Sequence, residues 1–152
     1  MRLLFIGDVV GKPGREGLAA AMPGLRAEHM PDLVVVNGEN AAGGVGITEE
    51  TAAQIFEAGA DVITLGNHTY RHKDVYSYLD SEQRIIRPAN FTPQNPGRGH
   101  TIVEAAGMRV AVISLERIAR LPEFGERARG SVRALSRFPL VNYLPVALRA
   151  RA

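Results

Sequence analysis

The sequence contains no cysteine, and this absence excludes several classes of protein. Without thiols the chain can form no disulfide scaffold and no zinc–thiolate site, and it has no cysteine nucleophile. Such a composition is typical of a cytoplasmic protein, and we expect that location. Long apolar runs are also missing, because the opening run stops at Gly7. It falls short of a secretory core and of the roughly 20 residues of a membrane-spanning helix, so we expect no membrane partner.

What is present is the composition of a globular domain. The chain has 152 residues, of which 45% are hydrophobic and 22% charged, enough for one domain with its own core. The formal net charge of +2 hides an asymmetry. Residues 1–115 carry ten Lys or Arg against thirteen Asp or Glu, whereas residues 116–152 carry eight Arg against three Glu. We therefore divide the chain into a main portion, 1–115, and an atypical Arg-rich tail, 116–152.

Apolar runs and helical patterns alternate in the main portion. Short continuous apolar runs at 2–7, 33–36 and 61–65 predict strands that are buried on both faces. Helices are expected over 15–25, where Pro23 should bend or end the helix, and over 48–58. Strand–helix–strand repeats at this spacing predict an α/β fold built from parallel βαβ units.

The second predicted helix carries its own boundary signals. Thr48 suits the N-cap, Glu49 and Glu50 suit the positive end of the helix dipole, and Gly59 suits the position just after the end. Beyond it we expect a further helix, a strand and then a hairpin, over 73–80, 84–88, and 100–104 with 109–115.

A polar cluster follows each of the first three strands. Asp8 comes after the first strand, Glu39 and Asn40 after the second, and Asn67 and His68 after the third. Carboxyl ends of parallel strands share one edge of the sheet, where open α/β folds bind ligands, so these side chains should converge. Each cluster alone has an ordinary interpretation, such as a helix cap, a solvated loop or a turn. Their joint occurrence favours a metal or phosphate site.

Oxygen ligands and an imidazole suit Mn, Fe, Mg or Zn. Glu39 could bridge two ions, and a hydroxide held between them would attack phosphorus in line. His68 could protonate the leaving oxygen. The glycine-rich segment 41–46 is either a flexible loop or a nest of amides for phosphate. We expect His29, His72 and His100 to play no part as ligands.

Several segments together resemble one protein family. They are GDVVGKPGR at 7–15, NGENAAGG at 37–44, GNHT at 66–69, RPAN at 87–90 and PGRG at 96–99. In this order they resemble the YmdB-like branch of the calcineurin-like metallophosphoesterases. The resemblance covers about residues 1–115.

The resemblance implies a four-layer αββα sandwich with parallel βαβ units followed by a hairpin. It also implies a site for two divalent metal ions, usually iron or manganese, and phosphodiesterase activity with cyclic nucleotides as the substrate class. By matched position Asp8, Glu39, Asn40 and Asn67 would be metal ligands, and His68 would be the catalytic imidazole.

The chain departs from the family pattern in two places. Tyr70-Arg71 stands where Trp-Asp is usual, and no histidine follows His100, although the family draws three further ligand histidines from its C-terminal half. The tail is either a shifted reading frame or a native ending that folds back over the site. We expect this 152-residue form to bind metal weakly and to turn over slowly or not at all.

Two other functions stay open. The chain could be a non-catalytic module in which Asp8, Glu39 and a single metal ion hold a phosphate or nucleotide, with amides of the loop at 43–46 donating to it. Nucleic-acid binding through the arginines of the tail is the weaker alternative, because the tail carries no recognisable motif. If half of the sandwich is absent, an uncovered sheet face should promote self-association, so we expect a homo-oligomer.

Overall fold

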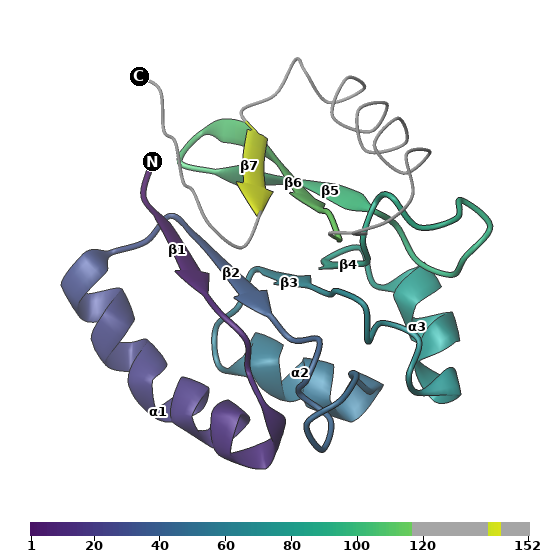
Figure 1. Ribbon diagram of the computed structural model, residues 1–152. Helices are drawn as coiled ribbons and strands as arrows, with labels where there is room; N and C mark the ends of the chain where they lie inside the picture. Colours follow the sequence, from purple (N-terminus) through teal and green to yellow (C-terminus); the bar gives the residue numbers. More distant parts are fainter. Residues whose placement is uncertain (117–139, 144–152) are drawn as a thin grey trace.

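The structure, a computed structural model, describes residues 1–116 and the backbone of residues 140–143. It contains two sheets (Figure 1). The first sheet has four parallel strands in the order β1-β2-β3-β4, and the second has three in the order β5-β6-β7. The strands of the first sheet are β1 (Leu3–Ile6), β2 (Leu33–Asn37), β3 (Val62–Thr64) and β4 (Ile85–Ile86). Those of the second are β5 (His100–Ala105), β6 (Met108–Ser114) and β7 (Leu140–Tyr143).

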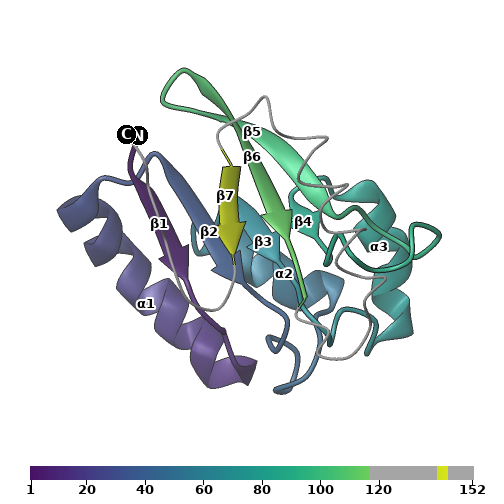
Figure 2. The same cartoon turned by 45° about the horizontal axis from the view of Figure 1, so that its top comes forward.

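Helices cover one face of the first sheet, and the second sheet lies over the other (Figures 1 and 2). The helices are α1 (Gly11–His29), α2 (Glu49–Glu57) and α3 (Tyr76–Ser81), the last preceded by a 3-10 turn, η1 (Lys73–Val75). The described residues thus form three layers, and none of them forms the fourth layer that the resemblance implies. None of the described helices is long and apolar enough to cross a bilayer.

Alternation along the strands creates two apolar cores. Val34, Val36 and Ile63 point toward the helices and pack in one core with residues of α1 and α2. Their neighbours Val35 and Val62 point the other way, toward residues of the hairpin, in a second core. The central strands are therefore buried on both faces, which explains their continuous apolar sequences. The second sheet covers the inner face of the first sheet. What lies on the other face of the second sheet, where the uncovered face is expected, falls outside the described residues.

The helix ends follow local chemistry. Thr48 caps α2 by accepting from the Thr51 amide at 3.3 Å, and the Thr51 hydroxyl in turn accepts from the Thr48 amide at 2.9 Å. Gly59 has a φ of +107°, as predicted for the residue that ends this helix. The expected end at Pro23 was wrong, because α1 continues from Gly11 to His29. The proline removes one hydrogen bond, which the packing of buried Leu18 and Met22 outweighs.

The second sheet begins as a hairpin. Ala106 and Gly107 both have positive φ, 49° and 72°, which is the geometry of a tight two-residue turn between antiparallel strands. β7 then pairs with β6 in parallel. This strand lies in the Arg-rich tail, where the sequence had no clear period, and it was not predicted. The other expectations for the tail fall outside the described residues.

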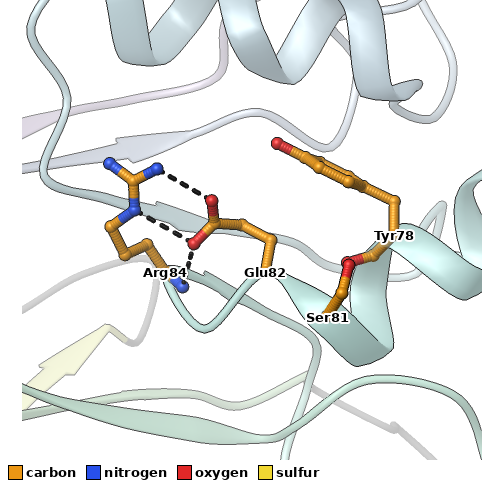
Figure 3. Close-up of polar contacts among 4 residues, drawn as sticks. All are labelled: Tyr78, Ser81, Glu82 and Arg84. Atoms are coloured by element: carbon orange, nitrogen blue, oxygen red, sulfur yellow. Dashed lines mark hydrogen bonds and ion pairs between the residues drawn. The ribbon is translucent and has the colours of Figure 1, made fainter.

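A short ion-pair network fixes the connection from α3 to β4. Figure 3 shows the Arg84 guanidinium against the Glu82 carboxylate, with nitrogen–oxygen distances of 3.0 and 2.8 Å. These hydrogen bonds hold the pKa of Glu82 below its ordinary value. The same guanidinium lies 4.1 Å above the ring centroid of Phe56 and so links this connection to α2.

Candidate functional site

The polar clusters predicted to converge do lie at one edge of the first sheet. Because all four of its strands are parallel, the chain leaves each of them at the same rim. Backbone hydrogen bonds join the departing segments: Val9 N to Asn37 O at 3.1 Å, Gly11 N to Asn40 O at 2.9 Å, and Gly38 N to Thr64 O at 3.0 Å. The segments after β1, β2 and β3 therefore form one connected surface.

Three of the predicted site residues are linked by hydrogen bonds. The Asn40 amide nitrogen lies 2.9 Å from each carboxylate oxygen of Asp8, to which it donates. The amide oxygen of Asn40 lies 2.6 Å from Nδ1 of His68. An amide oxygen only accepts, so His68 carries a proton on Nδ1, and its Nε2 remains available for other chemistry. Asp8 is not a helix cap, since α1 is capped by Val10 without a side-chain bond.

The Glu39 side chain lies against the backbone of Gly66, in the segment that follows β3. One carboxylate oxygen, Oε2, is buried and has no hydrogen-bond partner among the residues that the structure describes. A Cβ added at Gly66 would lie 2.7 Å from both Cδ and Oε1 of Glu39 and closer still to Oε2. The glycine before Asn67 therefore makes room for this carboxylate. A buried carboxylate oxygen without a partner is costly, and a bound cation would satisfy it.

Asn67 and His68 leave β3 together. Asn67 is exposed at the rim, while His68 is partly buried against Asn40. The buried Thr69 hydroxyl donates to Gly66 O at 2.6 Å and fixes the turn that presents them. Among the residues that the structure describes, no three His, Cys, Asp or Glu side chains form a group able to hold a metal. The arrangement thus offers two carboxylates, two amides and one imidazole.

Tyr70 anchors the segment after His68. Its hydroxyl donates to Pro96 O at 2.7 Å, and its ring packs edge-on to Tyr76 with centroids 5.4 Å apart. Burial raises the pKa of Tyr70, with Arg87 opposing this effect, so the phenol stays protonated and remains a donor. Arg71 points to the exposed surface.

The glycine-rich loop at 41–46 is internally bonded. The Val45 amide donates to Ala42 O at 3.2 Å, and the Gly46 amide donates to Glu39 O at 2.7 Å. These two amides are thus engaged within the loop, which argues against their use in a phosphate nest. The loop is also held from α1, because the Arg15 guanidinium donates to Ala41 O and to the Gln54 side chain, the latter at 2.6 Å.

The remaining histidines lie outside the cluster of Asp8, Asn40 and His68, and one of them contacts the glycine-rich loop. His29 ends α1 beside Glu28, and His100 is exposed at the start of β5. His72 contacts Val45 through its ring nitrogen at 2.9 Å, a contact that the sequence did not reveal. Two further features were not predicted from the sequence: the fit of Glu39 against Gly66 and the hydrogen bond from Arg15 to the loop. The glycine at position 66, just before Asn67 and His68, was the sequence feature that could have indicated the first of these, because a side chain there would collide with the Glu39 carboxylate.

Comparison with known proteins identifies relatives of this arrangement. The family model described as YmdB-like protein matches residues 4–127. A 2′,3′-cyclic-nucleotide 2′-phosphodiesterase of Bacillus subtilis is 45% identical over 122 residues, which are 80% of this chain and 46% of the relative. The family match therefore includes every predicted site residue.

Solved structures give the same result. A hypothetical protein from Thermus thermophilus is similar with a TM-score of 0.79 and 35% identity, over 88% of this chain and 53% of that one. A structure described as a novel phosphatase from Mycoplasma pneumoniae has a TM-score of 0.72 and 31% identity, over 79% of this chain and 44% of that one. The chain spans about half the length of these relatives. By fold, by the polar residues at its sheet edge and by the family match, the chain belongs to the YmdB-like protein family.

Proposed function

We propose that the sheet-edge site binds divalent metal ions and hydrolyses phosphodiesters, with cyclic nucleotides as the substrate class. The observation that carries this proposal is the meeting of Asp8, Asn40 and His68, with the carboxylate of Glu39 beside Gly66. The name of the Bacillus relative supports the substrate class, and the phosphatase description of the Mycoplasma structure supports phosphoester chemistry.

The residues present fit a metal. Glu39 has a buried oxygen without a partner in the described part of the chain, and Asp8 presents an exposed carboxylate. The amide oxygens of Asn40 and Asn67 would add ligands without adding charge. We propose Asp8, Glu39, Asn40 and Asn67 as the ligands of two divalent ions, iron or manganese. When bound, such ions supply a nucleophilic hydroxide at neutral pH and stabilise charge on phosphate.

His68 is proposed as the group that moves a proton. Its Nδ1 donates to Asn40 at 2.6 Å, which fixes the ring orientation and directs Nε2 away from that bond. In the imidazolium form Nε2 would carry the proton that a leaving alkoxide needs. Asn40 is itself held by Asp8, so the orientation of the imidazole depends on both residues.

We expect weak metal binding by the chain as given. The described residues offer no group of three His, Cys, Asp or Glu, so much of the ligand set consists of neutral amides. Amide oxygens contribute less electrostatic attraction than carboxylates. We also propose a cytoplasmic protein that forms a homo-oligomer and acts on phosphodiesters or cyclic nucleotides rather than on nucleic acid.

Hydrolysis of 2′,3′-cyclic AMP and of bis(p-nitrophenyl) phosphate tests the enzyme. The protein is stripped with a chelator and then assayed with Mn²⁺ or Fe²⁺ added back. We expect slow turnover that requires the metal and that falls by about 100-fold in His68→Ala, the usual scale for a lost general acid. The matched control is His29→Ala, which lies at the far end of α1. Turnover that persists in His68→Ala or without metal would contradict the proposal.

A binding module without catalysis is the second candidate. It is favoured by the same scarcity of charged ligands among the described residues. In that case 2′,3′-cyclic AMP with Mn²⁺ would raise the unfolding temperature, yet no product would form over long incubation. Product formation that tracks enzyme concentration would exclude this alternative.

A further inference from the structure

Two loops carry the proposed site, and they touch at three places. The first loop runs from Glu39 to Gly46, and the second from Gly66 to His72. Glu39 lies against Gly66, and Asn40 accepts from His68 at 2.6 Å. The third contact joins the far ends of the loops, where Nε2 of His72 lies 2.9 Å from Val45 O. The first two contacts involve the site residues themselves, and the third does not.

The third contact is closely packed as well as hydrogen-bonded. A carbonyl oxygen only accepts, so His72 donates from Nε2. Gly46 has a φ of +84°, and a Cβ at this position would lie 2.7 Å from Cδ2 of His72 and 2.8 Å from Cβ of Arg71. The imidazole therefore lies directly on the Gly46 backbone. Glycine is required there both for its φ and for this approach.

Gly46 in turn holds Glu39. The buried Gly46 amide donates to Glu39 O at 2.7 Å, the shortest of the backbone bonds that close the loop, and Gly46 O accepts from the Ala42 amide at 2.9 Å. On the second loop, the Arg71 amide donates to His68 O at 3.1 Å. In the first loop, His72 packs on Gly46, which is itself hydrogen-bonded to Glu39. In the second loop, His72 directly follows Arg71, whose amide is hydrogen-bonded to His68.

We propose that His72 is a positioning residue that sets the separation of the two loops and so the placement of Glu39 relative to His68. This inference rests on the proposed metal site. Without the imidazole, the first loop loses the hydrogen bond from His72 to Val45 O and the packing of the ring on Gly46. Glu39 then keeps its carboxylate contact with Gly66 but loses the support of its backbone. The expected consequence is weaker metal binding with an intact fold.

The test compares His72→Ala with His72→Gln, which keeps an N–H donor of similar reach, and with His29→Ala as a control. In metal-free protein, NMR hydrogen exchange of the Gly46 amide reports the loop directly. Mn²⁺ affinity is measured separately by electron paramagnetic resonance. We expect His72→Ala to speed Gly46 exchange and to weaken Mn²⁺ binding by about fivefold each, the scale of one net hydrogen bond. His72→Gln should restore most of both, and His29→Ala should change neither.

The outcomes separate the two proposals. Unchanged Gly46 exchange and Mn²⁺ affinity in His72→Ala would overturn the positioning role. Equal losses in His72→Ala and His72→Gln would also overturn it, because the donor would then not matter. If the unmutated protein binds no Mn²⁺, the proposed metal site fails, and Gly46 exchange still decides whether His72 holds the loop.

Discussion

Gly66→Ala probes the geometry of the site at a single carbon atom. The new Cβ would lie 2.7 Å from Cδ and Oε1 of Glu39, whereas ordinary contacts begin at 3.4 Å. The carboxylate must therefore retreat by about 0.7 Å at Oε1 and farther at Oε2. The Gly66 backbone does not have positive φ, so alanine introduces no backbone strain. The substitution thus moves the Glu39 carboxylate without altering the fold.

Gly66→Ala should affect stability and metal affinity to different extents. Moving a flexible carboxylate to another rotamer costs about 0.5–1.5 kcal/mol, so the free energy of unfolding should change little. Displacing a metal ligand or its immediate support usually costs about 10–100-fold in metal affinity. We therefore expect Gly66→Ala to fold normally and to bind Mn²⁺ at least about tenfold more weakly.

The assay pairs a Mn²⁺ titration with thermal unfolding in chelator. The control is Gly17→Ala, since nothing lies within 4 Å of a Cβ at that position in α1. That change should stabilise the helix by about 0.5–1 kcal/mol and leave metal binding unchanged. Normal Mn²⁺ affinity in Gly66→Ala would refute the placement of Glu39 as a ligand.

Three further predictions concern the scaffold. Thr48→Ala removes the cap of α2 and should cost about 1 kcal/mol of unfolding free energy, seen as a fall of about 2–4 °C in the unfolding temperature. Tyr70→Phe leaves Pro96 O without its donor and should cost about 1 kcal/mol in urea unfolding. The pKa of Glu82 is lowered by its hydrogen bonds with Arg84, so its stabilisation is present above the unfolded pKa and is lost as pH falls through the folded one. Glu82→Gln should therefore lose stability at pH 7 but not at pH 2, by no more than about 1 kcal/mol because the pair is partly exposed.

Much of the fold could be predicted because its signals are local. The apolar runs in β1, β2 and β3 are continuous because both faces of this sheet are covered. The cap at Thr48 was visible from its spacing to the helix. Pro23 misled the prediction, since tertiary packing of α1 outweighs the loss of one hydrogen bond. β7 gave no usable pattern in the sequence.

The candidate site likewise has a part that could be predicted from the sequence and a part that could not. Convergence of Asp8, Asn40 and His68 followed from parallel strands alone, and their hydrogen bonds confirm that meeting. The space for Glu39 above Gly66 depends on a distance between two loops, which no local pattern encodes. Whether these residues bind metal stays a prediction.

The most direct measurement is the anomalous scattering of Mn²⁺ in a crystal of this chain soaked with the ion. We expect a peak within about 2.5 Å of carboxylate oxygens of Asp8 and Glu39, which is an ordinary coordination distance. That peak should be absent from Glu39→Gln crystals soaked in the same way. A crystal soaked to saturation that shows no Mn²⁺ peak beside Asp8 and Glu39, or shows peaks only elsewhere, would contradict the proposed metal site.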